Sequence, residues 1–211
     1  SEMCIRDSFI AVKGMTSDGH DYVDAAIERG AVGVIVERAV RENMPDGVSS
    51  ILVPDSRQAL GALSSEWNGN PSGDLRVVGV TGTNGKTTTA FLVHRIMKQT
   101  MQRAGLVGTV VSDDGMTQEQ ADFTTPGPIS LQSLLARIRN NGCPGVALEV
   151  SSQGLDQRRA DAITFDVAVF TNLTRDHLDY HGSMEKYFAS KRRLFENCLL
   201  YTSDAADELC R

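Results

Sequence analysis

The chain has 211 residues and a formal net charge of −6, with 41% hydrophobic and 23% charged residues. This composition is ordinary for a globular protein with room for one large or two modest domains, and the acidic balance gives no reason to expect a nucleic acid partner. No apolar run approaches the length of a membrane helix, and the first residues lack the apolar core of a secretory signal. We therefore expect a cytoplasmic protein that does not contact membranes.

The four cysteines are too widely spaced for a metal site or a dense disulfide framework. They are Cys4, Cys143, Cys198 and Cys210. We expect free thiols.

The first part of the chain alternates short apolar runs with two helical patterns. Residues 9–12, 31–37 and 49–54 predict strands, and residues 18–30 and 55–67 predict helices. The segment 68–74, "NGNPSGD", is rich in Gly, Pro and polar residues. We therefore predict an N-terminal domain over 1–70 and a second domain over 75–211.

The second part repeats a strand, loop and helix pattern. Strands are predicted over 76–80, 105–111, 145–151 and 166–173, and helices over 86–103, 128–142 and 183–197. The continuous apolar strands are typical of a parallel sheet covered on both faces. The predicted fold class is α/β: a small N-terminal α/β domain followed by a domain with a mainly parallel sheet.

The stretch "VTGTNGKTT", residues 80–88, indicates a phosphate-binding loop between a strand and a helix. The general pattern places a glycine where Val80 stands, while Gly79 and Gly82 flank that position. Backbone N–H groups and the positive helix N-terminus would bind phosphate oxygens, Lys86 would contact the outer phosphates, and Thr87 would hold Mg²⁺. The alternative is a glycine turn without a ligand.

Two further clusters follow apolar strands. Glu149 lies at the carboxyl end of a predicted strand, where it would bind either Mg²⁺ or an Arg or Lys partner. The loop after residue 173 contains Asp176, His177, Asp179 and His181, which suits metal or acid–base chemistry, or simply a capped loop with surface histidines.

Four segments, taken in order, resemble the Mur ligases, the ATP-dependent enzymes that build the peptide stem of bacterial cell-wall precursors. They are "TGTNGKTT", "TTP", "LEVSSQGLDQRR" and "FTNLTRDHLDYHGSMEKYFASKRRLF". The resemblance covers about residues 9–197, and its last part is specific to the MurE group, which adds the third stem residue. It implies a ligase that joins meso-diaminopimelate or L-lysine to UDP-N-acetylmuramoyl-L-alanyl-D-glutamate through an acyl phosphate.

The resemblance also implies roles for individual residues. Catalysis would depend on Lys86, Glu149, His177 and Lys191, the last as a carbamate formed from CO₂. ATP would contact Gly82, Thr83, Asn84, Gly85, Lys86, Thr87 and Thr88. Mg²⁺ would be held by Thr87, Glu149 and His177. The UDP-muramoyl dipeptide would contact Thr124, Thr125, Ser151, Gln157 and Arg159, with Met15, Thr16 and Ser17 at its uridine end.

Lys191 would not be selected from its local pattern, because three adjacent cations on a helix usually form a solvated face. We leave Arg175 and Asp176 as residues that shape the loop. Phe123 and Gln153 depart from the residues common in the family, and the family's early Asp-Ser-Arg motif is not recognisable after Asp7.

The two ends, residues 1–8 and 198–211, interrupt the resemblance and look like adapter-derived sequence. The family's C-terminal domain has no counterpart here, so we expect the chain to be inactive alone and, like the parent enzyme, monomeric. Three alternatives stay open: a related ligase such as folylpolyglutamate synthetase, a non-catalytic nucleotide-binding module, and, less favoured, a kinase or GTPase.

Overall fold

The computed structural model describes residues 8–14, 16–41, 43–196 and 198. The chain divides into two compact units between Leu60 and Gly61, within helix α2 (Ser56–Trp67). The predicted termini of doubtful origin lie almost entirely outside the described residues, as do Cys4 and Cys210. None of the helices in the described ranges is both long and apolar enough to span a membrane.

The first unit contains a three-stranded parallel sheet in the order β1–β2–β3. Ala11, Val23, Val34 and Val36 form its small buried core. The predicted strands and helix are confirmed, although the helix begins as a 3-10 turn. The elements are β1 (Ser8–Ile10), η1 (Gly19–Tyr22), α1 (Val23–Glu28), β2 (Gly33–Val36) and β3 (Ser49–Leu52).

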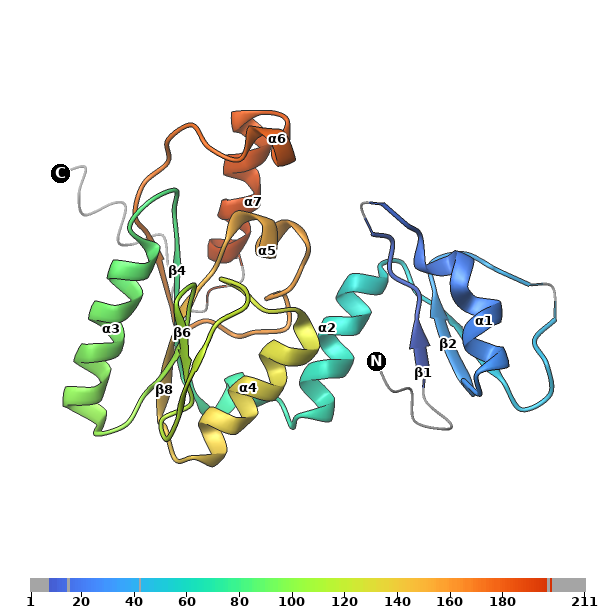
Figure 1. Cartoon of the computed structure of the whole chain (residues 1–211), viewed down its shortest axis with the longest axis horizontal. Helices are drawn as coiled ribbons and strands as arrows, with labels where there is room; N and C mark the ends of the chain where they lie inside the picture. The colour runs from blue at the N-terminus through green and yellow to red at the C-terminus, as the bar shows by residue number, and fades with distance from the viewer. Residues whose placement is uncertain (1–7, 15, 42, 197, 199–211) are drawn as a thin grey trace. The chain divides into compact units, whose positions relative to one another are not determined.

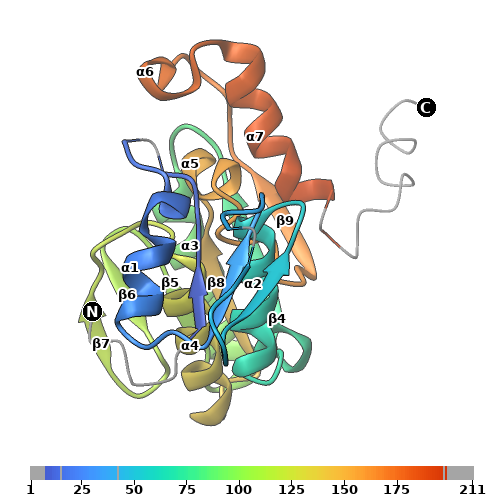
Figure 2. The same cartoon turned by 90° about the vertical axis from the view of Figure 1, so that its right-hand side faces the viewer.

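The second unit is built on a six-stranded sheet in the order β7–β6–β5–β8–β4–β9 (Figure 2). Strands β5, β8, β4 and β9 run parallel, and β6 and β7 are antiparallel to their neighbours. The predicted α/β class with a mainly parallel sheet is therefore confirmed. The strands are β4 (Arg76–Thr81), β5 (Gly105–Val107), β6 (Val111–Asp113), β7 (Gln118–Gln120), β8 (Gly145–Glu149) and β9 (Val167–Phe170).

Helices cover both faces of this sheet (Figure 1). The α3 face buries Val80, Ala90 and Met97. The opposite face buries Val77 and Leu148 against α4 and α7 residues such as Leu135 and Leu194. Since consecutive strand residues point to opposite faces, continuous apolar strands can fill both cores. The remaining elements are η2 (Pro71–Asp74), α3 (Lys86–Met101), α4 (Pro128–Asn140), α5 (Ser152–Asp156), α6 (Leu178–His181) and α7 (Met184–Glu196).

The single strand predicted over 105–111 is wrong, because the chain turns between β5 and β6. A Cβ on Gly108 would collide with the Glu149 carboxylate, and the Thr109 N–H donates to that carboxylate at 2.9 Å. The turn thus brings the backbone at Gly108 and Thr109 into contact with the buried side chain of Glu149 in β8. The β6–β7 pairing and helix α5 were not predicted, and part of the loop predicted after residue 173 forms the one-turn helix α6.

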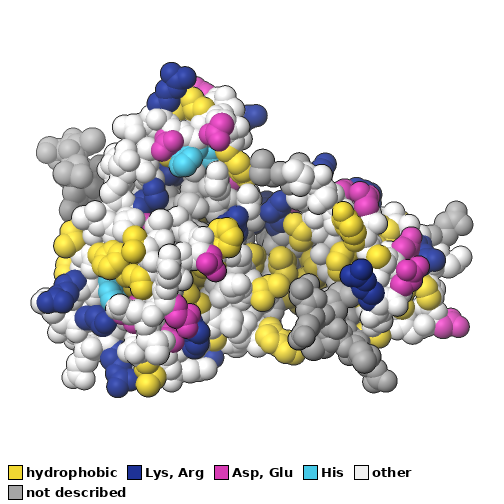
Figure 3. Space-filling model, in the orientation of Figure 1, with side chains coloured by type: hydrophobic (Ala, Val, Ile, Leu, Met, Phe, Trp, Pro, Cys, Tyr) yellow, Lys and Arg dark blue, Asp and Glu magenta, His cyan; other side chains and the backbone are white. Residues whose placement is uncertain are grey.

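On the face drawn in Figure 3, positive and negative side chains are interspersed over the described residues rather than gathered by sign.

Candidate active site

The loop from β4 to α3 has the backbone of a phosphate-binding loop. Gly82 and Gly85 have positive φ angles of 147° and 84°, which disfavour other residues. A Cβ on Gly82 would also overlap the Thr171 hydroxyl. The loop then leads into the N-terminus of the 16-residue helix α3, at Lys86. The displaced glycine of the sequence pattern therefore still gives a loop of this kind.

Lys86 folds back over this loop. Its Nζ donates to the carbonyl oxygens of Gly82 and Thr83, each at 2.9 Å. Burial lowers the pKa of the Lys86 ammonium, while the nearby carboxylates of Glu149 and Asp176 act in the opposite direction. The loop is fixed from the other side by the Thr83 hydroxyl, which lies 3.0 Å from the Tyr187 hydroxyl of α7.

Glu149 ends strand β8 beside the loop and is completely buried. Its carboxylate accepts hydrogen bonds from the Thr87 hydroxyl at 2.9 Å and from the Thr109 N–H and hydroxyl at 2.9 and 3.0 Å. Three neutral donors thus stabilise this charge, where the sequence left open an Arg or Lys partner. Thr109 was missed because the apolar run around it concealed the turn.

Lys191 is 1% exposed, in contrast to the solvated face that its neighbours suggest. Its Nζ donates to the Gly82 carbonyl at 2.8 Å and lies 4.6 Å from the centre of the Tyr187 ring. Burial, with the nearby Lys86 charge as a second cause, lowers the pKa of Lys191 to about 8. Two lysines therefore converge on one carbonyl oxygen of the phosphate loop.

The residues predicted to contact a dipeptide are linked to one another. The Thr125 hydroxyl donates to the Glu149 carbonyl at 3.0 Å and accepts from the Ser151 N–H at 3.0 Å. The Arg159 guanidinium donates to the Thr125 carbonyl at 2.7 Å and to Gln157 Oε1 at 2.8 Å. The Ser151 hydroxyl accepts from the Gly154 N–H and so caps α5. These contacts hold Arg159 beside the carboxyl ends of the strands.

A cavity of about 380 Å³ lies at this edge of the sheet. Its walls include seven of the predicted site residues, which are Lys86, Thr124, Thr125, Ser151, Arg159, His177 and Lys191. Thr109, Asp122, Phe123, Ser152 and Gln153 complete the lining. Three further predicted residues do not line the cavity but contact residues that do, directly or through one another. Glu149 accepts from Thr109, Thr87 donates to Glu149, and Gln157 accepts from Arg159. Cationic side chains dominate the cavity, which suits an anionic ligand.

His177 precedes α6 with a left-handed φ of 50°. The His177 ring lies edge-on to the Tyr187 ring, with 6.1 Å between their centres. The backbone N–H of His177 donates to Asp176 Oδ1 at 2.8 Å. Thr88 is exposed in the first turn of α3, and the Asn84 N–H donates to Asn172 Oδ1 at 3.0 Å.

Two of these residues have oxygen atoms that fit a divalent cation. Thr87 and Glu149 offer hydroxyl and carboxylate oxygens 2.9 Å apart, which is the ligand chemistry that Mg²⁺ selects. No group of three or more His, Cys, Asp or Glu side chains forms a metal site within the described part of the chain.

The first unit contains a separate cavity of about 430 Å³, lined by Phe9, Ile10, Ser17 and Tyr22 among others. Ser17 and Thr16 are exposed, and Met15 lies outside the described residues. The uridine contacts remain a prediction.

Comparison with known families gives two matches. Residues 80–203 match the Mur ligase middle domain, and residues 1–68 match the Mur ligase family catalytic domain. A UDP-N-acetylmuramoyl-L-alanyl-D-glutamate–2,6-diaminopimelate ligase from Parabacteroides distasonis is 46% identical over 189 residues, covering 90% of this chain and 39% of the relative. The ligase of the same name from Geobacter sulfurreducens is 48% identical over 187 residues, covering 89% and 36%.

Solved structures agree. A ligase of that same name superposes with a TM-score of 0.74 at 31% identity, covering 92% of this chain and 39% of the other. MurF from Thermotoga maritima in complex with ADP gives a TM-score of 0.55 at 27% identity, covering 98% and 46%. The chain thus spans 36–39% of the length of these two curated relatives. With a middle-domain match across more than half its length, and a phosphate loop at the expected place, the chain belongs to the Mur ligase family.

Proposed function

We propose that this chain is part of an ATP-dependent amide ligase of the MurE group. Its substrates would be UDP-N-acetylmuramoyl-L-alanyl-D-glutamate and a diamino acid. The observation that carries the proposal is the convergence of Lys86 and Lys191 on the Gly82 carbonyl, beside buried Glu149. The names of the relatives favour 2,6-diaminopimelate over L-lysine.

The reaction would proceed in two steps. A carboxylate oxygen of the D-glutamate attacks the γ-phosphorus of ATP, the new O–P bond forms, and the bond to the β-phosphate oxygen breaks to release ADP. The amine of the diamino acid then attacks the acyl carbon, the C–N bond forms, and inorganic phosphate leaves as the amine loses a proton. Lys86, whose Nζ contacts the loop carbonyls, would stabilise charge on the transferred phosphoryl group, which is the main requirement of such chemistry.

Mg²⁺ would be held by Thr87, Glu149 and His177. The first two are in hydrogen-bond contact, and His177 lines the cavity in front of them. When bound, it supplies positive charge to the phosphates of ATP. The hydrogen bonds from Thr109 would restrict the orientation of the Glu149 carboxylate as a ligand.

Lys191 would act as a carbamate. Its neutral amine attacks the carbon of CO₂, the N–C bond forms, and one proton is released. A pKa near 8 leaves part of the amine neutral at physiological pH, which an ordinary lysine would not provide. The resulting anion would lie beside Lys86 and remove the repulsion between the two ammonium groups.

The dipeptide end of the nucleotide substrate would contact Thr124, Thr125, Ser151, Gln157 and Arg159. Met15, Thr16 and Ser17 would contact its uridine end. We also propose that the full-length enzyme is a monomer located in the cytoplasm.

The test is phosphate release by the full-length protein whose gene contains this sequence. The assay supplies ATP, Mg²⁺, UDP-N-acetylmuramoyl-L-alanyl-D-glutamate and either meso-diaminopimelate or L-lysine, with Lys86→Met as the inactive control. Release that requires the nucleotide precursor and one diamino acid supports the proposal and identifies that amino acid. Release that instead requires a folate substrate, or ATP binding without release, contradicts it.

A further inference from the structure

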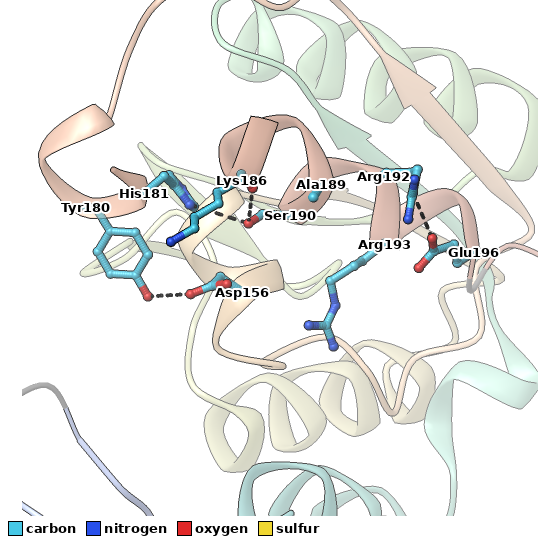
Figure 4. A pocket seen from close by; sticks show the side chains of 9 residues that line it. All are labelled: Asp156, Tyr180, His181, Lys186, Ala189, Ser190, Arg192, Arg193 and Glu196. Carbon is cyan, nitrogen blue, oxygen red and sulfur yellow. Dashed lines mark hydrogen bonds and ion pairs between the residues drawn. The ribbon is translucent and has the colours of Figure 1, made fainter. Parts of the chain in front are cut away.

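His181 connects the active-site cavity to helix α7 but has no role in the function proposed above. It is 6% exposed at the end of α6. Its Nε2 lies 3.0 Å from the Ser152 hydroxyl of α5, and its Nδ1 lies 3.4 Å from the Ser190 hydroxyl of α7. Figure 4 shows His181 and Ser190 facing each other in the wall of a neighbouring pocket.

The direction of these hydrogen bonds follows from the hydrogens available. The Ser190 hydroxyl donates to the Lys186 carbonyl at 2.9 Å, so it can only accept from His181. We therefore assign the ring hydrogen to Nδ1, which leaves a lone pair on Nε2. The Ser152 hydroxyl must then donate its one hydrogen to His181.

This assignment decides what Ser152 offers to a ligand. Ser152 is 2% exposed and lines the same cavity as Lys86, Lys191 and Arg159. With its hydrogen donated to His181, the Ser152 oxygen has only lone pairs left for a further hydrogen bond. The cationic groups of Lys86 and Arg159 can only donate hydrogen bonds, so Ser152 contributes an acceptor to the same cavity.

We propose that Ser152 is a ligand-binding residue that accepts a hydrogen bond from an N–H in the peptide part of the nucleotide substrate, and that His181 is the positioning residue that keeps Ser152 in this orientation. The inference rests on the proposed function, since that substrate combines anionic groups with peptide N–H groups. A nucleotide lacking peptide N–H groups, such as ATP, would not depend on Ser152.

The test is a set of variants of the full-length enzyme, assayed for KM, kcat and binding of UDP-N-acetylmuramoyl-L-alanyl-D-glutamate by calorimetry. Ser152→Ala removes the acceptor, and His181→Phe keeps a ring but removes the nitrogen that orients it. His181→Gln retains a polar group at the position of Nε2. Ser65→Ala is the control, since Ser65 is also a buried serine and donates to Asn70 Oδ1 at 3.0 Å.

We expect Ser152→Ala and His181→Phe each to raise the Kd and KM for the nucleotide precursor about tenfold, with the KM for ATP unchanged. The double variant should show no further loss, and His181→Gln should recover most of the affinity. Equal Kd values for wild type and Ser152→Ala, or fully additive losses in the double variant, would overturn the inference. A wild-type enzyme that neither binds nor converts the precursor would instead contradict the proposed function, and the inference with it.

Discussion

Two buried ionisable side chains, Glu149 and Lys191, contact the phosphate loop or the start of the helix that follows it, and their surroundings differ. The Glu149 carboxylate is surrounded by three hydrogen-bond donors from Thr87 and Thr109. The Lys191 ammonium has the Gly82 carbonyl, the face of the Tyr187 ring and a second lysine close by. Neither side chain is more than 1% exposed.

The difference lies in hydrogen bonding: the Glu149 carboxylate accepts three hydrogen bonds, and the Lys191 ammonium donates one to the Gly82 carbonyl. A buried carboxylate with several donors keeps its charge at a modest cost in free energy, whereas a buried ammonium with few acceptors favours its neutral form. The Glu149 carboxylate therefore has its hydrogen-bond donors within the fold, whereas burial lowers the pKa of Lys191. The predictions below test this contrast, beginning with the largest expected effect.

Replacement of Lys191 by Ala should reduce phosphate release by the full-length enzyme about 10³-fold, because the group beside the transferred phosphoryl is lost. Arg192→Gln is the matched control, since Arg192 is the next residue on α7 and forms an exposed ion pair with Glu196 at 2.9 Å. Activity of Lys191→Ala within tenfold of the control would remove Lys191 from the mechanism.

Replacement of Glu149 by Ala should lower the free energy of unfolding by about 2–4 kcal/mol, because three donors lose their buried acceptor. Urea unfolding of this chain measures the change. A loss below that of an exposed carboxylate such as Glu66→Ala would mean that the cluster around Glu149 does not stabilise the fold.

Replacement of Lys191 by Met should have the opposite sign and raise the free energy of unfolding by roughly 1–3 kcal/mol at pH 7. The folded-state pKa of Lys191, about 8, lies below the ordinary lysine value of 10.5. The cost of burying the ammonium is therefore full below pH 8 and disappears as the pH rises through 8 toward 10.5. Wild type and variant should converge in stability over that window. A variant that is less stable than wild type at pH 7 would show that the ammonium is well solvated by the protein.

Replacement of Gly108 by Ala should lower the free energy of unfolding by about 1–2 kcal/mol, because the new Cβ collides with the Glu149 carboxylate. Gly73→Ala is the control, since a Cβ there meets nothing within 4 Å. Equal melting temperatures for the two variants would mean that the turn at Gly108 is free to move away from Glu149.

The part of the site that lies along a continuous stretch of chain could be predicted from the sequence. The loop at Gly82 and Gly85, with Lys86 opening a helix, follows from local glycine and helix signals. The position of Glu149 beside it follows from the geometry of parallel strands, whose carboxyl ends share one edge.

The remainder depends on packing between distant segments. The turn at Gly108 looks like more apolar strand, because the reason for it is a side chain 41 positions away in strand β8. The burial of Lys191 depends on how α7 packs its Tyr187 against Thr83, which no helical periodicity reveals. The partners of His181 come from α5 and α7, and local sequence indicates only a histidine in a polar loop.

The most direct test of the contrast between Glu149 and Lys191 is to measure the pKa of Lys191 in this chain. An NMR pH titration of the lysine side-chain Nζ signals gives this pKa, and Lys191→Arg assigns the signal. We predict that Lys191 titrates near pH 8. An ordinary titration near pH 10.5 would show that the protein supports the ammonium as well as water does, and would contradict the role of Lys191 as a reactive amine.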